Sequence, residues 1–300
     1  QLPFGVYKEN SIMNFKENFI NKINKDFFSF DEINNYKSNY SMMNYIITDY
    51  LTFKDTNYAY PIGGFVEDVE RIKYKTMLKF WKKYYNPENV ILVIVGKVPS
   101  NIEDTIKKLF GKLPSNPYKN EVNLICKDKL ILPVQTEARL IQMPVKIVST
   151  YLQLSFPICN YYNNDKYPLQ IISSILGVGL SSRLFIELRE KLGIVYSVSS
   201  NIELYDTVGN FNINIITEHT NINKSIEVIL KTILNLKKTI SLKEIKKSIQ
   251  QIKSSLILSA ENSTELNNFY LYQLLFNNKP NCVLEKQTKI NSFNQEFTNY

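Results

Sequence analysis

The chain has 300 residues, of which 44% are hydrophobic, and a formal net charge of +8 at pH 7. This apolar content is sufficient for hydrophobic cores and excludes a largely disordered chain, while no run of about 18 apolar residues is present to span a membrane. The length favours two domains. Residues 1–5 contain neither a Met nor a secretory pattern, which is typical of an interior cut.

The excess of basic over acidic residues makes nucleic-acid binding one hypothesis. The lysines are spread along helical segments such as 245–249, however, which is typical of solvated helix faces, so we predict no nucleic-acid partner. Cys126, Cys159 and Cys282 are far apart in the sequence and odd in number. This pattern favours neither a disulfide framework nor a cysteine zinc site, and it indicates a reducing soluble compartment such as the cytoplasm or an organelle matrix.

The first half of the chain combines helical periodicity with one apolar run of β-branched residues. The predicted elements are helices over 11–56 and 69–85, a buried strand over 90–95, and a helix that Ser100 or Asn101 caps and that ends at Phe110. Prolines cluster after this helix, and they predict a first domain over 1–120, a linker over 121–137 and a second domain over 138–300.

The second half places its strands before its longest helices. The predicted strands cover 138–145, 150–156, 194–204 and 208–217, and the predicted helices cover 165–176, 181–192, 222–238, 242–259 and 264–276. Strands followed by a run of helices indicate an α+β domain in which the helices form a layer on the sheet.

The segment from Leu180 to Val198 has the most informative pattern. Its helix should bury Leu184, Phe185, Leu188 and Leu192. Arg189 should lie at the edge of this stripe, and Gly193 should end the helix in a left-handed conformation. Tyr196 then begins a strand, on the same face as Ile194 and Val198. A guanidinium and a phenol folded toward each other can hold a peptide carbonyl or a developing oxyanion, whereas the alternative is a surface arginine beside a core tyrosine.

Two other patterns have mainly structural explanations. His219 is the single histidine, so the chain cannot form a two-histidine metal site by itself. The Gly177-Val-Gly179 sequence before a helix lacks the third glycine and the lysine of a phosphate loop, and a tight turn between helices is the better interpretation.

The run from Leu180 to Tyr196, LSSRLFIELREKLGIVY, resembles the second-domain signature of the pitrilysin/insulinase zinc metallopeptidases, a family similar to mitochondrial processing peptidase. Tyr60 to Gly64 and Phe80 to Gly96 are similar to the end of that family's first domain. The resemblance implies two related sheet-plus-helix domains, the first truncated at its N-terminus, that face each other across a cavity. It also implies that Arg189 and Tyr196 hold the substrate backbone over the zinc.

The resemblance further implies an inverted H-x-x-E-H motif and a downstream glutamate as zinc ligands. The motif is expected before Gln1, and residues 33–50 contain no glutamate, with Glu32 too early and Asp49 too late. Two interpretations stay open: an active single-chain zinc metalloendopeptidase whose motif lies upstream, or a non-zinc half that supplies the Arg/Tyr pair. We favour the second.

Under this interpretation the chain contributes no catalytic residue and no metal ligand, and zinc belongs to the complete enzyme. The expected partners are an unfolded peptide substrate and a zinc-bearing peptidase-like subunit or domain. A non-catalytic scaffold subunit is a further alternative.

Overall fold

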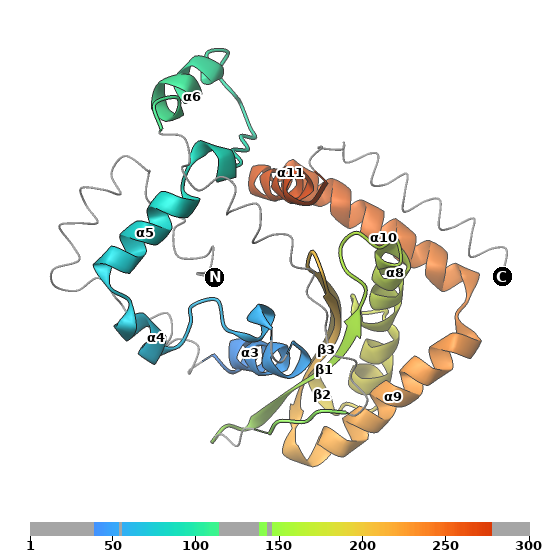
Figure 1. Cartoon of the computed structure of the whole chain (residues 1–300). Coiled ribbons are helices and arrows are strands. Elements are labelled where there is room, and N and C mark those ends of the chain that lie inside the picture. The colour runs from blue at the N-terminus through green and yellow to red at the C-terminus, as the bar shows by residue number, and fades with distance from the viewer. Residues whose placement is uncertain (1–38, 54–55, 114–137, 143–145, 278–300) are drawn as a thin grey trace. The chain divides into compact units, whose positions relative to one another are not determined.

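The computed structural model describes residues 39–53, 56–113, 138–142 and 146–277 (Figure 1). The chain divides into two compact units, one comprising 1–78 with 132–146 and the other 79–131 with 147–300. The predicted boundaries at 120 and 137 stay predictions. Within the described residues, no helix is long and apolar enough to cross a bilayer.

The secondary structure that is described in the first unit is helical. Helix α3 covers Tyr40–Thr52, and it begins where the Asn39 side chain accepts a hydrogen bond from the Met42 amide at 3.1 Å. The short helix η1 (Asn57–Ala59) and helix α4 (Val66–Arg71) follow. The Arg139 guanidinium donates to the Leu51 carbonyl at 2.6 Å, which ties a distant segment of the same unit to the end of α3.

Helix α5 (Tyr74–Tyr84) crosses the division between the units. The single helix predicted over 69–85 is therefore wrong, because Ile72 adopts an extended conformation between α4 and α5, and no Gly or Pro in the sequence marks this break. Helix α5 ends at Tyr84, next to the predicted end at 85, and the short helix η2 covers Pro87–Asn89. Helix α6 covers Ile102–Phe110 as predicted.

The buried strand predicted over 90–95 is wrong, because Val90, Ile91, Leu92 and Ile94 are exposed and no strand is formed there. A strand requires a neighbour with which to exchange backbone hydrogen bonds. The one hydrogen bond recorded for this run is the Asn267 side-chain amide donating to the Val93 carbonyl at 2.8 Å. Residues 138–142 likewise form no strand, contrary to this part of the prediction for 138–145, and residues 143–145 lie outside the described residues.

The second unit contains an antiparallel sheet in the order β1-β3-β2. Its strands are β1 (Ser149–Ile158), β2 (Val195–Leu204) and β3 (Gly209–Glu218). The helices are α8 (Lys166–Gly177), η3 (Phe185–Lys191), η4 (His219–Asn221), α9 (Ile222–Thr239), α10 (Leu242–Glu261) and α11 (Ser263–Asn277). The α+β class and most of the predicted second-half elements are confirmed.

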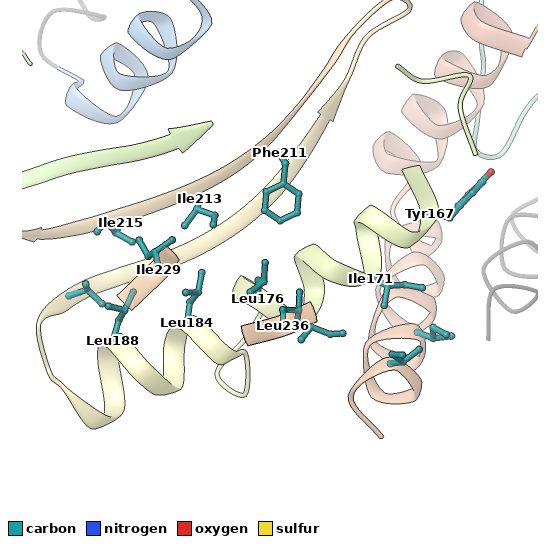
Figure 2. Close-up of a cluster of buried hydrophobic side chains, with 14 residues drawn as sticks. Tyr167, Ile171, Leu176, Leu184, Leu188, Phe211, Ile213, Ile215, Ile229 and Leu236 are labelled. Atoms are coloured by element: carbon teal, nitrogen blue, oxygen red, sulfur yellow. The ribbon is translucent and has the colours of Figure 1, made fainter. Parts of the chain in front are cut away.

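One hydrophobic core joins the sheet to the helices that cover one of its faces (Figures 1 and 2). Strand β3 alternates apolar with polar residues, so that Phe211, Ile213 and Ile215 point into this core while the intervening asparagines point away. The helical side of the core consists of Tyr167, Ile171, Ile175, Leu176, Leu184, Leu188, Ile229, Leu236, Ile245 and Ile249.

The helix α8 approaches β2 closely at Gly177. A Cβ atom at this position would lie 2.5 Å from the Ser200 amide nitrogen and 2.9 Å from the Ser199 carbonyl carbon. Gly179 then turns the chain at a φ of +82°. Gly179 thus lies in a turn, as predicted, whereas the close packing at Gly177 was not predicted.

Candidate functional site

The helix that carries Arg189 is a π-helix over Phe185–Lys191, not the predicted α-helix over 181–192. Its wide turn is visible where the Leu192 amide donates to the Glu187 carbonyl five residues earlier, at 3.2 Å. Leu184 and Leu188 are fully buried and anchor this helix on the sheet (Figure 2), whereas Leu192 is 43% exposed, contrary to the expected stripe. Single π-helical turns are rare and occur frequently at functional sites.

The Arg189 side chain folds back onto the strand that follows. Gly193 ends the helix at a φ of +63°, as predicted, and this reversal brings the start of β2 beside the guanidinium. The Nη1 atom of Arg189 donates to the Val195 carbonyl at 2.7 Å. Since a guanidinium has five N–H donors and Arg189 is exposed, this bond orients the group while leaving donors for a ligand.

A β-bulge sets the direction of Tyr196. Val195 lies opposite Thr217 and Ser197 opposite Ile216, so Tyr196 is the extra residue on β2. The bulge lets Val195 and Val198, which are three positions apart, both pack toward the helices. The prediction that Ile194, Tyr196 and Val198 share one face is therefore wrong, because strict alternation fails at a bulge and Tyr196 is 52% exposed.

The Tyr196 hydroxyl donates to Glu218 Oε1 at 3.1 Å. This hydrogen bond and the negative charge of Glu218 raise the pKa of Tyr196, while the positive charge of Arg189 acts in the opposite direction. Arg189 and Tyr196 are therefore within electrostatic reach of each other. Glu218 was not predicted from the sequence, because it is brought to Tyr196 by the pairing of β2 with β3.

His219 lies next to this group, in the short helix after β3. Its Nδ1 contacts the Thr150 hydroxyl, and its Nε2 lies 3.3 Å from the Ile147 carbonyl. In the parts of the chain that the structure describes, no three His, Cys, Asp or Glu side chains are grouped so as to hold a metal ion. The described donor set therefore does not fit zinc. Asp49 lies on α3, while Glu32 and 33–38 lie outside the described residues.

The sheet face opposite the helices is polar. Ser155 donates to Asn212 Oδ1 at 2.7 Å, Asn214 to Asn201 Oδ1 at 3.1 Å, and Asn201 to Glu203 Oε1 at 3.2 Å. Partial burial raises the pKa of Glu203. This network lies on the same face as Glu218, because alternate residues of β3 share a face.

Only one cysteine of the sequence falls within the described residues. Cys159 is a free, half-buried thiol, and burial raises its pKa. Cys126 and Cys282 lie outside the described residues.

The comparisons with known proteins agree on one family. Residues 71–252 match the family described as the peptidase M16 inactive domain. An uncharacterized zinc protease of Rickettsia bellii is 30% identical over 211 residues, covering 70% of this chain and 49% of that protein. The uncharacterized zinc protease YmxG of Bacillus subtilis is 27% identical over 215 residues, with coverages of 71% and 50%. The chain thus spans about half the length of these relatives.

The fold also matches solved structures. The peptidase M16 inactive domain from Pseudomonas fluorescens superposes with a TM-score of 0.69 at 21% identity, and the match covers 85% of this chain and 62% of that one. At this identity the likeness shows a shared fold.

Proposed function

This chain belongs to the peptidase M16 family, as its resemblance to pitrilysin and insulinase predicted, and we propose that its own contribution is to hold an extended peptide substrate. Arg189 and Tyr196 are the residues that contact the peptide in this proposal. The complete enzyme would use zinc that a peptidase-like partner subunit or domain supplies, since the described donor set does not fit the metal.

The observation that carries the proposal is the position of the Arg189 guanidinium on the Val195 carbonyl, beside the exposed Tyr196. Both groups lie at the start of β2, and β2 pairs with β3 alone among the described strands. An extended peptide can add to such an edge through its backbone groups, whatever its side chains. The π-helix and the bulge support this assignment, because both are backbone irregularities that often aim functional side chains.

Two substitutions test the assignment in the complete peptidase, formed by this chain with a partner that carries H-x-x-E-H. Arg189→Ala removes charge-assisted hydrogen bonds and should lower kcat/KM for a peptide about ten- to a hundredfold. Tyr196→Phe removes one hydroxyl and should lower it about three- to tenfold. Both variants should fold normally by circular dichroism, because both side chains are exposed.

The chain offers matched controls. Lys191→Ala removes an exposed positive charge from the same π-helix, and Tyr162→Phe removes a hydroxyl from another exposed tyrosine. Both controls should keep full activity. Full activity in Arg189→Ala and Tyr196→Phe would reject the assignment. If the control variants lost as much activity, the loss would be due to a general change of charge or polarity and not to these two residues.

A scaffold role is the second candidate, because the matched family is described as an inactive domain and the expected third-ligand glutamate is missing from 33–50. It predicts a stable complex with an H-x-x-E-H partner but no zinc-dependent proteolysis on mixing the two. An active single-chain enzyme predicts instead that the protein cleaves peptides without any partner.

A further inference from the structure

Glu218 is the last residue of β3, at the end of the sheet where β1 and β2 begin. It is exposed, as is Tyr196, so their hydrogen bond forms at the surface beside the edge of β2. The bulge directs Tyr196 toward the polar face that carries Glu218. Backbone geometry thus brings together two residues that are 22 positions apart in the sequence.

The Glu218 carboxylate fixes how Tyr196 can bind a ligand. An ionised carboxylate only accepts hydrogen bonds, and a phenol has a single proton to donate. With that proton directed at Glu218, the Tyr196 oxygen presents lone pairs to any other group. The Arg189 guanidinium has the opposite character, since it has donors and no acceptor. The site therefore combines one donor group with one acceptor group.

We propose that Glu218 is a positioning residue that makes Tyr196 a hydrogen-bond acceptor, so that a bound peptide donates an N–H to Tyr196 and accepts from Arg189 at a carbonyl. This inference rests on the proposed function. An extended peptide presents both N–H and C=O groups along its backbone, and a donor beside an acceptor distinguishes the two directions of the chain. Two donors side by side would instead hold carbonyls alone.

The first experiment measures Tyr196 itself and requires no ligand. The full chain is labelled with ¹³C at the tyrosine Cζ, and the Tyr196 signal, one of 20 tyrosines, is identified by its loss in Tyr196→Phe. The hydrogen bond to Glu218 and its charge raise the pKa of Tyr196, so Glu218→Gln should lower that pKa measurably. Glu227→Gln, which alters an exposed carboxylate on α9, should leave it unchanged. An unchanged Tyr196 pKa in Glu218→Gln would overturn the positioning role.

The second experiment tests the peptide contact. A panel of fluorescein-labelled 15-residue peptides of random sequence is screened by fluorescence anisotropy, and each backbone N–H of the tightest binder is replaced in turn by an ester oxygen. One ester position should weaken binding about three- to tenfold in the wild type. The same ester should cost less than about twofold in Tyr196→Phe and in Glu218→Gln, because the acceptor is lost or no longer fixed.

The outcomes separate the two proposals. If the ester costs the same in Glu218→Gln as in the wild type, the acceptor role of Tyr196 is wrong while the proposed function can still hold. If Arg189→Ala and Tyr196→Phe bind every peptide as tightly as the wild type, or if no peptide of the panel binds, the proposed function fails. The peptide contact inferred here then fails with it, and the titration of Tyr196 still decides whether Glu218 positions the phenol.

Discussion

An ion pair and two further hydrogen bonds of Arg183 connect the segment just before the Arg189 helix to the turn between α9 and α10. The Nε and Nη2 atoms of Arg183 donate to the two carboxylate oxygens of Glu244 at 2.7 and 2.9 Å. The same guanidinium donates to the Thr239 hydroxyl and to the Thr239 carbonyl, both at 2.8 Å. Glu244 also completes a capping box with Ser241 at the start of α10. We therefore predict that Arg183→Ala destabilises the second unit.

The magnitude follows from the pKa of Glu244. The hydrogen bonds from Arg183, foremost, and from Ser241 lower it from 4.5 to about 2, which corresponds to about 3 kcal/mol for a group shielded from water. The Arg183 and Glu244 side chains are 19% and 31% exposed, and solvent screening reduces this figure to about 1 to 2 kcal/mol. Lys107→Ala, which breaks an exposed 3.9 Å ion pair on α6, should cost less than about 0.5 kcal/mol.

The pH dependence provides the sharper test. The lowered pKa of Glu244 means that its contribution is complete above its ordinary pKa of 4.5 and is lost as the pH falls toward about 2. Urea unfolding, followed by far-UV circular dichroism from pH 7 to pH 2.5, should show the advantage of wild type over Glu244→Gln shrinking between pH 4.5 and 2.5. A constant difference across this range would refute the reasoning.

Substitutions at three further positions test the backbone and packing that position the site, each by thermal unfolding of the full chain. Gly177→Ala should cost about 1 to 3 kcal/mol, because its Cβ would meet the Ser199 and Ser200 backbone; a loss below 0.5 kcal/mol would contradict this close approach. Gly193→Ala should cost about 1 to 2 kcal/mol through its φ of +63°, and Gly193→Asn less, so equal losses would argue against the left-handed turn. Leu188→Ala should cost about 2 to 5 kcal/mol, since Leu188 is fully buried, and a neutral result would mean that the π-helix is not anchored there.

The second half of the fold could be predicted well because its signals are local. The alternation of Phe211, Ile213 and Ile215 with asparagines specifies a strand with one apolar face, and a glycine directly after an apolar helical stripe, such as Gly193, indicates a left-handed helix end. The apolar run over 90–95 shows the limit of such signals. Composition indicates that a segment is suited to a strand, but a strand forms only where a neighbour accepts and donates its hydrogen bonds.

In the candidate site, too, local features could be predicted and features that depend on strand pairing could not. The residue types at 189 and 196 and the glycine between them were sufficient to propose a guanidinium and a phenol on either side of one turn. The bulge at Tyr196 was not predictable, because it is a register shift of β2 against β3 that allows both Val195 and Val198 to pack toward the helices. Register against another strand is a property of the pair.

The sequence by itself determined the α+β class, the family resemblance and the two side chains expected to contact substrate, since periodicity, glycine positions and motif spacing are all encoded along the chain. Only the tertiary structure decided that Glu218 accepts the Tyr196 proton and that Arg183 clamps the turn before α10 at Glu244. Both contacts join residues from separate elements, so packing in three dimensions brings them together.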